Sequence, residues 1–135
     1  MAGIANSMAV LSRALDLRSQ RHQVLASNIA NADTPNYKAR DFDFRAAMQN
    51  ALGAAGAGVL SMARTAGGHL EGSAGAGGVS LRYRAETQSA VDGNTVDMDV
   101  ERSQIAENAM QYEILTRLVN DRLQGLRTAL SSTNS

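Results

Sequence analysis

The chain has 135 residues, with 13 basic and 13 acidic side chains and a formal net charge of +0. Balanced charge argues against general nucleic-acid binding, which usually needs a basic excess. The lack of cysteine excludes disulfides, thiolate zinc sites and cysteine nucleophiles. Of the hydrophobic residues, 23 are alanine, and Leu, Ile, Val and Phe together number 27. Because large apolar side chains supply most burial energy, we expect a partly unfolded monomer or a core completed by partner chains.

The sequence predicts neither a membrane-spanning helix nor a cleaved secretory signal. It contains no run of about 18 apolar residues, the length that a spanning helix requires. Its N-terminus lacks the basic start and apolar block of a secretory signal. If the protein leaves the cytoplasm, we therefore expect it to use another route.

Residues 1–31 predict a long N-terminal amphipathic helix, with its periodic part in residues 4–31. Side chains recur at alternating spacings of four and three residues, which is a heptad seam. The seam consists of Ile4, Met8, Leu11, Leu15, Arg18, His22, Leu25 and Ile29. Such a helix would be about 40 Å long. Pro35 cannot continue it and disfavours helix at Thr34, so we expect the helix to end near residue 31.

Residues 32–50 predict a turn, an extended segment and the start of a short helix. Pro35 and Asn36 fit the two central positions of a turn. A type II turn needs a positive φ at its second central residue, which Asn tolerates better than most residues. Charged and aromatic residues alternate over residues 40–45, as in an extended chain. Residues 46–52 favour a short helix.

Residues 51–91 predict a glycine-rich, flexible middle. Nine of the twelve glycines lie in residues 53–80, and no hydrophobic period survives there. Such composition is typical of flexible chain. Residues 81–83 favour a short strand.

Residues 92–135 predict a turn followed by a long C-terminal helix. Asp97 or Asp99 suits the N-cap position. The helix carries an apolar stripe that two helices alone cannot cover, so we expect neighbouring subunits to complete it. The stripe consists of Ile105, Tyr112, Leu115, Val119 and Leu126, widened by Leu118, Leu123 and Leu130. The predicted fold is mainly α, with two long terminal helices pairing as a coiled-coil-like unit around an irregular glycine-rich middle.

Motifs for catalysis or ligand binding fail on inspection. A calcium loop starting at Asp92 would place Val96 at position 5 and Asp97 at position 6, where an oxygen ligand and Gly are needed. The GAAGAG run lacks the Lys of a phosphate-binding loop. His22 and His69 are far apart in the sequence. We therefore predict no catalytic, cofactor-binding or metal-binding residue, and no enzyme activity.

Two blocks of sequence resemble the flagellar rod and hook proteins. LASNIANADTPNYKARDFDF, residues 25–44, is similar to their N-terminal signature, with Asn36 in place of the usual Gly. The matching residues are Asn28, Ile29, Ala30, Asn31, Thr34, Pro35, Tyr37 and Lys38. Residues 92–130 resemble the C-terminal block of the proximal rod members of that family. The two blocks occur in the family's order and spacing.

The resemblance implies a structural subunit of the bacterial flagellar basal body. Such subunits polymerise into the proximal rod, which crosses the periplasm and transmits motor torque, and they are required for flagellum assembly and motility. The implied partners are further copies, other rod subunits, and the membrane ring or export gate. The implied export route is the flagellar type III apparatus, without a cleaved signal. No nucleic acid, small-molecule substrate or cofactor is implied.

We expect subunit contacts to come from both terminal helices and from the turn. The residues are Ile4, Met8, Leu11, Leu15, Leu25, Asn28, Ile29, Asn31, Thr34, Pro35, Tyr37, Ile105, Tyr112, Leu115, Val119 and Leu126. Three alternatives remain at this point. The first is that the chain is a different proximal rod subunit of the same family. The second is a cytoplasmic coiled-coil adaptor or export chaperone. The third and least favoured is a cell-wall hydrolase using Asp97 or Asp99.

Overall fold

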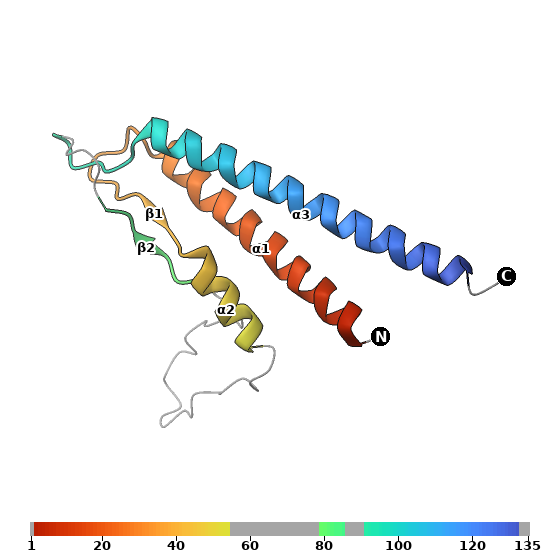
Figure 1. Cartoon of the computed structure of the whole chain (residues 1–135). Coiled ribbons are helices and arrows are strands. Elements are labelled where there is room, and N and C mark those ends of the chain that lie inside the picture. The colour runs from red at the N-terminus through yellow and green to blue at the C-terminus, as the bar shows by residue number, and fades with distance from the viewer. Residues whose placement is uncertain (1, 55–78, 86–90, 133–135) are drawn as a thin grey trace, which may run out of the picture.

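Two long helices dominate the computed structural model, which describes residues 2–54, 79–85 and 91–132. In chain order the elements are α1 (Ala2–Ala30), β1 (Arg40–Asp41), α2 (Phe44–Ala54), β2 (Arg82–Tyr83) and α3 (Met98–Ser132). Helices α1 and α3 run antiparallel side by side, so the two termini lie at one end and the connecting bend at the other (Figure 1). This arrangement confirms the predicted pairing of the terminal helices.

The short elements pack against α1. Strand β1 pairs with β2 in antiparallel register, Arg40 opposite Tyr83 and Asp41 opposite Arg82. Helix α2 follows β1 and also contacts α1 (Figure 1). The strand expected over residues 81–83 is confirmed as β2. Most of the glycine-rich segment, expected to be flexible, lies outside the described residues.

The extended segment is shorter than predicted. The prediction ran over residues 40–45, but α2 already begins at Phe44. The reason is a cap: Asp43 accepts a hydrogen bond from the Ala46 amide at its Oδ1, 3.1 Å away, and from the Ala47 amide at its carbonyl. An Asp at this position satisfies donors that the first helical turn leaves free. The helix predicted for residues 46–52 is therefore present, and it is longer.

The core is small, as the composition predicts. Its buried apolar side chains are Leu11, Ala14, Leu17, Leu25, Ala39, Phe42 and Ala51. Several large apolar side chains on α3 remain exposed instead, including Met110, Ile114 and Leu130. No helix in the described part of the chain is long and apolar enough to span a membrane.

The predicted heptad seam of α1 is confirmed only in part. Leu11 and Leu25 are buried as expected. His22, however, is exposed, and Arg21 takes the inward position, where it bonds β1 and α3. Likewise Asn28, not Ile29, is fully buried. Neighbouring helix residues differ by about 100° in direction. Because Arg21 and Asn28 face inward, the next residues, His22 and Ile29, point more toward solvent than the apolar pattern predicted.

Candidate assembly site at the bend of the helical pair

A tight turn follows α1 at the predicted place. The Tyr37 amide donates to the Thr34 carbonyl at 3.2 Å, which closes a turn around Pro35 and Asn36. Asn36 has φ of 59°, so the expected positive φ is confirmed. Thr34 and Pro35 are exposed at this tip. The turn therefore presents its outer residues to solvent while its backbone is fixed.

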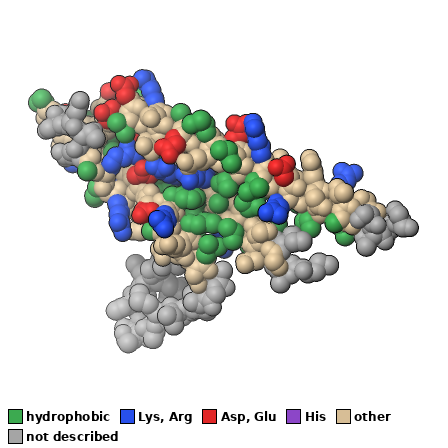
Figure 2. Space-filling model, in the orientation of Figure 1, with side chains coloured by type: hydrophobic (Ala, Val, Ile, Leu, Met, Phe, Trp, Pro, Cys, Tyr) green, Lys and Arg blue, Asp and Glu red, His purple; other side chains and the backbone are tan. Residues whose placement is uncertain are grey.

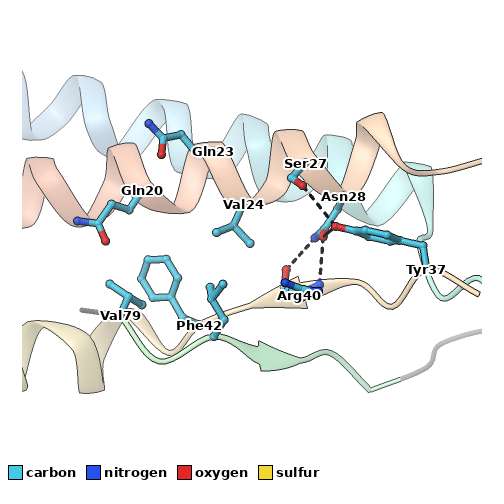
Figure 3. A pocket seen from close by; sticks show the side chains of 10 residues that line it. Gln20, Gln23, Val24, Ser27, Asn28, Tyr37, Arg40, Phe42 and Val79 are labelled. Atoms are coloured by element: carbon cyan, nitrogen blue, oxygen red, sulfur yellow. Dashed lines mark hydrogen bonds between the residues drawn. The ribbon is translucent and has the colours of Figure 1, made fainter. Parts of the chain in front are cut away.

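Asn28 ties α1 to β1 and α3. Its Nδ2 donates to the Arg40 carbonyl at 2.7 Å, and its Oδ1 accepts from the Arg40 amide at 3.0 Å (Figure 3). The carboxamide thus pairs with the edge of β1 as a neighbouring strand would. Nδ2 also lies 3.2 Å from Oε2 of Glu101 on α3, and the Tyr37 hydroxyl donates to Oδ1 at 3.4 Å. Both signature residues therefore have structural roles.

Asn94 caps the C-terminal end of α1 from the far end of the sequence. Its Nδ2 lies within hydrogen-bond distance of three carbonyl oxygens, those of Asn31 at 3.0 Å, Ala32 at 2.8 Å and Thr34 at 2.9 Å. Carbonyls just past a helix end have no helical partner. The side chain is buried. The sequence showed Asn94 only as a turn residue, because nothing local reveals contacts that span about 60 residues.

The bend and the segment before α3 are joined by backbone bonds. The Asn36 amide donates to the Asp92 carbonyl at 2.9 Å, and the Thr95 amide donates to the Tyr37 carbonyl at 3.0 Å. Gly93, with φ of 74°, packs against Asn36 so closely that an added Cβ would lie 2.7 Å from Asn36 Oδ1. Two left-handed residues therefore face each other at the tip.

A network of charged side chains links four elements. Arg21 donates to both carboxylate oxygens of Asp41, at 3.1 and 2.9 Å, and to Gln104 at 2.7 Å. Arg84 bridges Asp41, at 3.0 Å, and the fully buried Glu101. Since Glu101 also accepts from Asn28, the network closes back on α1. It fixes the positions of α1, β1, β2 and α3 relative to one another.

The network shifts the proton affinities of its members. Burial raises the pKa of Asp41, but the hydrogen bonds from Arg21 and the Phe42 amide, with the nearby guanidinium groups, outweigh it and hold this pKa below its ordinary value. The hydrogen bond to Asp41 correspondingly raises the pKa of Arg21. Both groups are therefore charged at neutral pH.

Polar contacts also run along the α1–α3 interface. The buried Asn108 donates from Nδ2 to the Arg18 carbonyl at 2.9 Å. On the side of α1 that meets α2, the Arg18 guanidinium lies over the ring of Phe44, 3.6 Å from its centroid, a favourable cation–π geometry. Burial, followed by the nearby charge of Arg21, lowers the pKa of Arg18. Specific polar contacts thus join the buried apolar side chains of α1 in holding the helices together.

The predicted contact residues fall into three groups. Leu11, Leu25 and Asn28 are buried within the chain. Thr34, Pro35 and Tyr112 are exposed, and the Ile4 side chain lies outside the described part. The half-buried group consists of Met8, Leu15, Ile29, Asn31, Tyr37, Ile105, Leu115, Val119 and Leu126. Their contacts with other subunits stay a prediction.

The acidic residues before α3 act as a helix start. Asp97 Oδ1 accepts hydrogen bonds from the amides of Asp99 at 3.0 Å and Val100 at 3.3 Å. Asp97 is therefore the N-cap that the sequence predicts. The described residues contain no cluster of three or more His, Cys, Asp or Glu side chains able to hold a metal.

Comparison with known proteins decides the family. Residues 8–38, which include Asn28 and the turn, match a family model described as flagella basal body rod protein. The chain is 41% identical over 124 residues to the flagellar basal body rod protein FlgB of Escherichia coli strain K12, covering 90% of each protein. The chain belongs to the FlgB family of flagellar basal body rod proteins. It is also 40% identical over 134 residues to FlgB of Cereibacter sphaeroides strain ATCC 17029, covering 96% of this chain and 98% of the relative.

Similarity to the FlgB relatives extends over most of the chain and so includes the bend and the charge network. The alignments cover both terminal helices and the segments between them, far beyond the signature at residues 25–44. The family is one of structural rod subunits in the flagellar basal body, and membership implies association with other rod components. The bend and the charge network are therefore features of a structural subunit.

Proposed function

We propose that this chain polymerises with other rod subunits into the proximal part of the flagellar rod, with the bend setting the geometry of its two terminal helices. The observation that supports this most is the buried network of Asn28, Asp41, Arg84 and Glu101, which joins the family signature to the C-terminal helix. A rod that transmits motor torque needs subunits that keep one shape under load. A fully bonded polar network specifies one helix arrangement more than it adds stability.

The outer surface supplies the contacts. Several large apolar side chains of α3 are exposed, among them Met110, Ile114 and Leu118, which recur every four residues along one side of the helix. Exposed apolar surface of this kind marks interaction sites. Thr34 and Pro35 add an exposed tip at the bend. We assign the sixteen residues predicted above to subunit packing, the buried ones by shaping each subunit and the exposed ones by touching its neighbours.

The proposed location is the periplasmic rod, reached through the flagellar type III export apparatus, with the membrane ring and export gate as neighbours at the rod base. The small core supports this route, because helices that bury little apolar surface are marginal alone. A marginal chain unfolds readily for passage through a narrow channel and gains stability when neighbours cover its apolar residues.

Deletion of the coding sequence in the source bacterium tests the proposal. We expect loss of swimming, with membrane rings present but no rod in electron micrographs of isolated basal bodies. The natural sequence restores both when supplied in trans. Normal rods in the deletion strain, without a second copy of the sequence, or accumulation of the protein only in the cytoplasm would contradict the proposal.

A further inference from the structure

A groove lies between α1 and the paired strands β1 and β2. It has a volume of about 310 Å³. Val24, Phe42, Val79 and Leu81 line it with apolar surface, and Gln20 and Gln23 on α1 stand beside these residues (Figure 3). Figure 2 shows hydrophobic side chains gathered in the middle of the corresponding face, over α1 and toward α2. Grooves of this kind accept a few apolar side chains from a helix.

Helix α3 carries a matching row of side chains. Met110 and Ile114 are 61% and 64% exposed and lie one helical turn apart. They point away from α1, because Asn108 on the opposite side of α3 is buried against it. Apolar anchors at positions i and i+4 are the usual way in which a helix enters a groove.

The charges around the two surfaces are complementary. Arg40 lines the groove, and the exposed Arg82 on β2 is next to Leu81 in the sequence. On α3 the exposed Glu107 and Glu113 flank Met110 at spacings of three residues, and Glu113 also pairs with Arg117. A basic rim facing an acidic flank favours this pairing and sets its orientation.

We propose that Met110 and Ile114 of one copy enter the groove between α1 and the paired strands β1 and β2 of a second copy. This inference rests on the proposed function and specifies how neighbouring subunits meet. The groove and the α3 row are different surfaces, so the contact is heterologous. It therefore leaves one groove and one row free at the two ends of every pair, and it repeats from copy to copy as a ring or helical assembly requires.

Disulfide cross-linking in isolated basal bodies tests the contact. The chain has no cysteine, so engineered cysteines report only their own neighbours within this protein. Cells producing Gln23→Cys/Ile114→Cys should give a ladder of oxidised bands at multiples of the 14.2 kDa chain. Cells producing the two single variants together should give dimers, and each single variant alone should give none.

The matched control is Gln23→Cys/Ala109→Cys, because Ala109 is exposed on another side of α3. An equally strong ladder from this control, or a cross-linked band of another mass, would overturn a second copy as the occupant. So would the absence of a ladder in swimming cells with intact rods, and in that case the proposed function would stand. If the first variant fails to assemble, Gln20→Cys/Met110→Cys gives the same reading.

Charge reversal gives a second test. Arg40→Glu in the Gln23→Cys/Ile114→Cys background should lower the total yield of cross-linked bands about fivefold, which is the effect expected from losing one ion pair at the rim of an interface. Adding Glu107→Arg should restore most of the yield. Equal yields for all three forms would contradict the proposed orientation.

Discussion

At the scale of single residues, three asparagines determine the bend. Asn28 bonds the backbone of β1, Asn36 adopts the left-handed turn position, and Asn94 holds the carbonyls that follow α1. Asn28 and Asn94 act through side-chain amides that bond backbone groups, whereas Asn36 acts through its backbone conformation. The residue types are ordinary loop formers, and their placement gives them their roles.

Replacing Asn94 tests the cap of α1. Asn94→Ala leaves the carbonyls of Asn31, Ala32 and Thr34 without their shared donor, which should cost about 1–3 kcal/mol in the free energy of unfolding. The measurement is the denaturant midpoint of the helical circular dichroism signal. Asn120→Ala, at an exposed position on α3, should change stability by no more than about 0.5 kcal/mol. Equal effects of both changes would argue against the cap.

Gly93 offers a test of close approach at the tip. Gly93→Ala adds a Cβ that meets Asn36 Oδ1 at 2.7 Å, at a φ of 74° that Ala disfavours. We expect a loss of unfolding free energy of about 1 kcal/mol or more. Gly125→Ala in α3, where a Cβ meets nothing within 4 Å, should instead stabilise the helix by about 1 kcal/mol. Thermal midpoints of the two variants that move in the same direction would contradict this interpretation.

At the scale of elements, the charge network connects segments that lie far apart in the sequence. Arg84, the residue after β2, reaches Asp41 on β1 and Glu101 on α3. Removing one charge of a buried ion pair leaves the charge of its partner uncompensated, which costs more than the intact pair contributes. The strands are only two residues long. We therefore expect the network, more than the β ladder, to hold the two paired strands against α1 and α3.

Paired substitutions in this network test that view. Arg84→Met leaves the buried carboxylate of Glu101 without its cation and should destabilise the fold by about 3 kcal/mol. Arg84→Met/Glu101→Met should lose less, because no uncompensated charge remains. Denaturant unfolding compares the two. A double variant that is less stable than the single variant would show that the network contributes through attraction and not through specification.

At the scale of the whole molecule, the described residues form a helical pair with a small apolar core, several large apolar side chains exposed, and the charged Glu101 fully buried. Its stability should therefore depend on pH. The pKa of Asp41 is lower in the folded chain than its ordinary 3.8, so the unfolded chain binds the proton more readily. The stability that Asp41 contributes is present above about pH 4 and is lost as pH falls through the lowered folded pKa.

Acid titration of the purified chain, followed by circular dichroism, checks this dependence. We expect helical signal to fall below about pH 4. Asp41→Asn should lower stability at pH 7 and weaken the acid dependence, whereas Asp121→Asn, at an exposed position on α3, should behave like the natural chain. An acid transition unchanged by Asp41→Asn would assign it to other carboxylates.

Features that depend only on neighbouring residues were predictable from the sequence. The spacing of apolar residues predicted both terminal helices, Pro35 ended the first, and Asn36 marked the positive φ. Asp97 and Asp99 were the two candidates for the N-cap of α3, and the structure selects Asp97. The signature block also indicated the family, which the alignments confirm. These signals are local, because a helix period, a turn and a cap are each set within a few residues.

Only the tertiary structure decided which polar side chains face inward. The heptad pattern selected His22 and Ile29, whereas Arg21 and Asn28 hold the interface, because their partners Asp41 and Glu101 lie far away in the sequence. Asn94 and Asn108 likewise act across 60 or more residues. Periodicity reports apolar burial within one helix, and it cannot register a hydrogen bond whose acceptor belongs to another element.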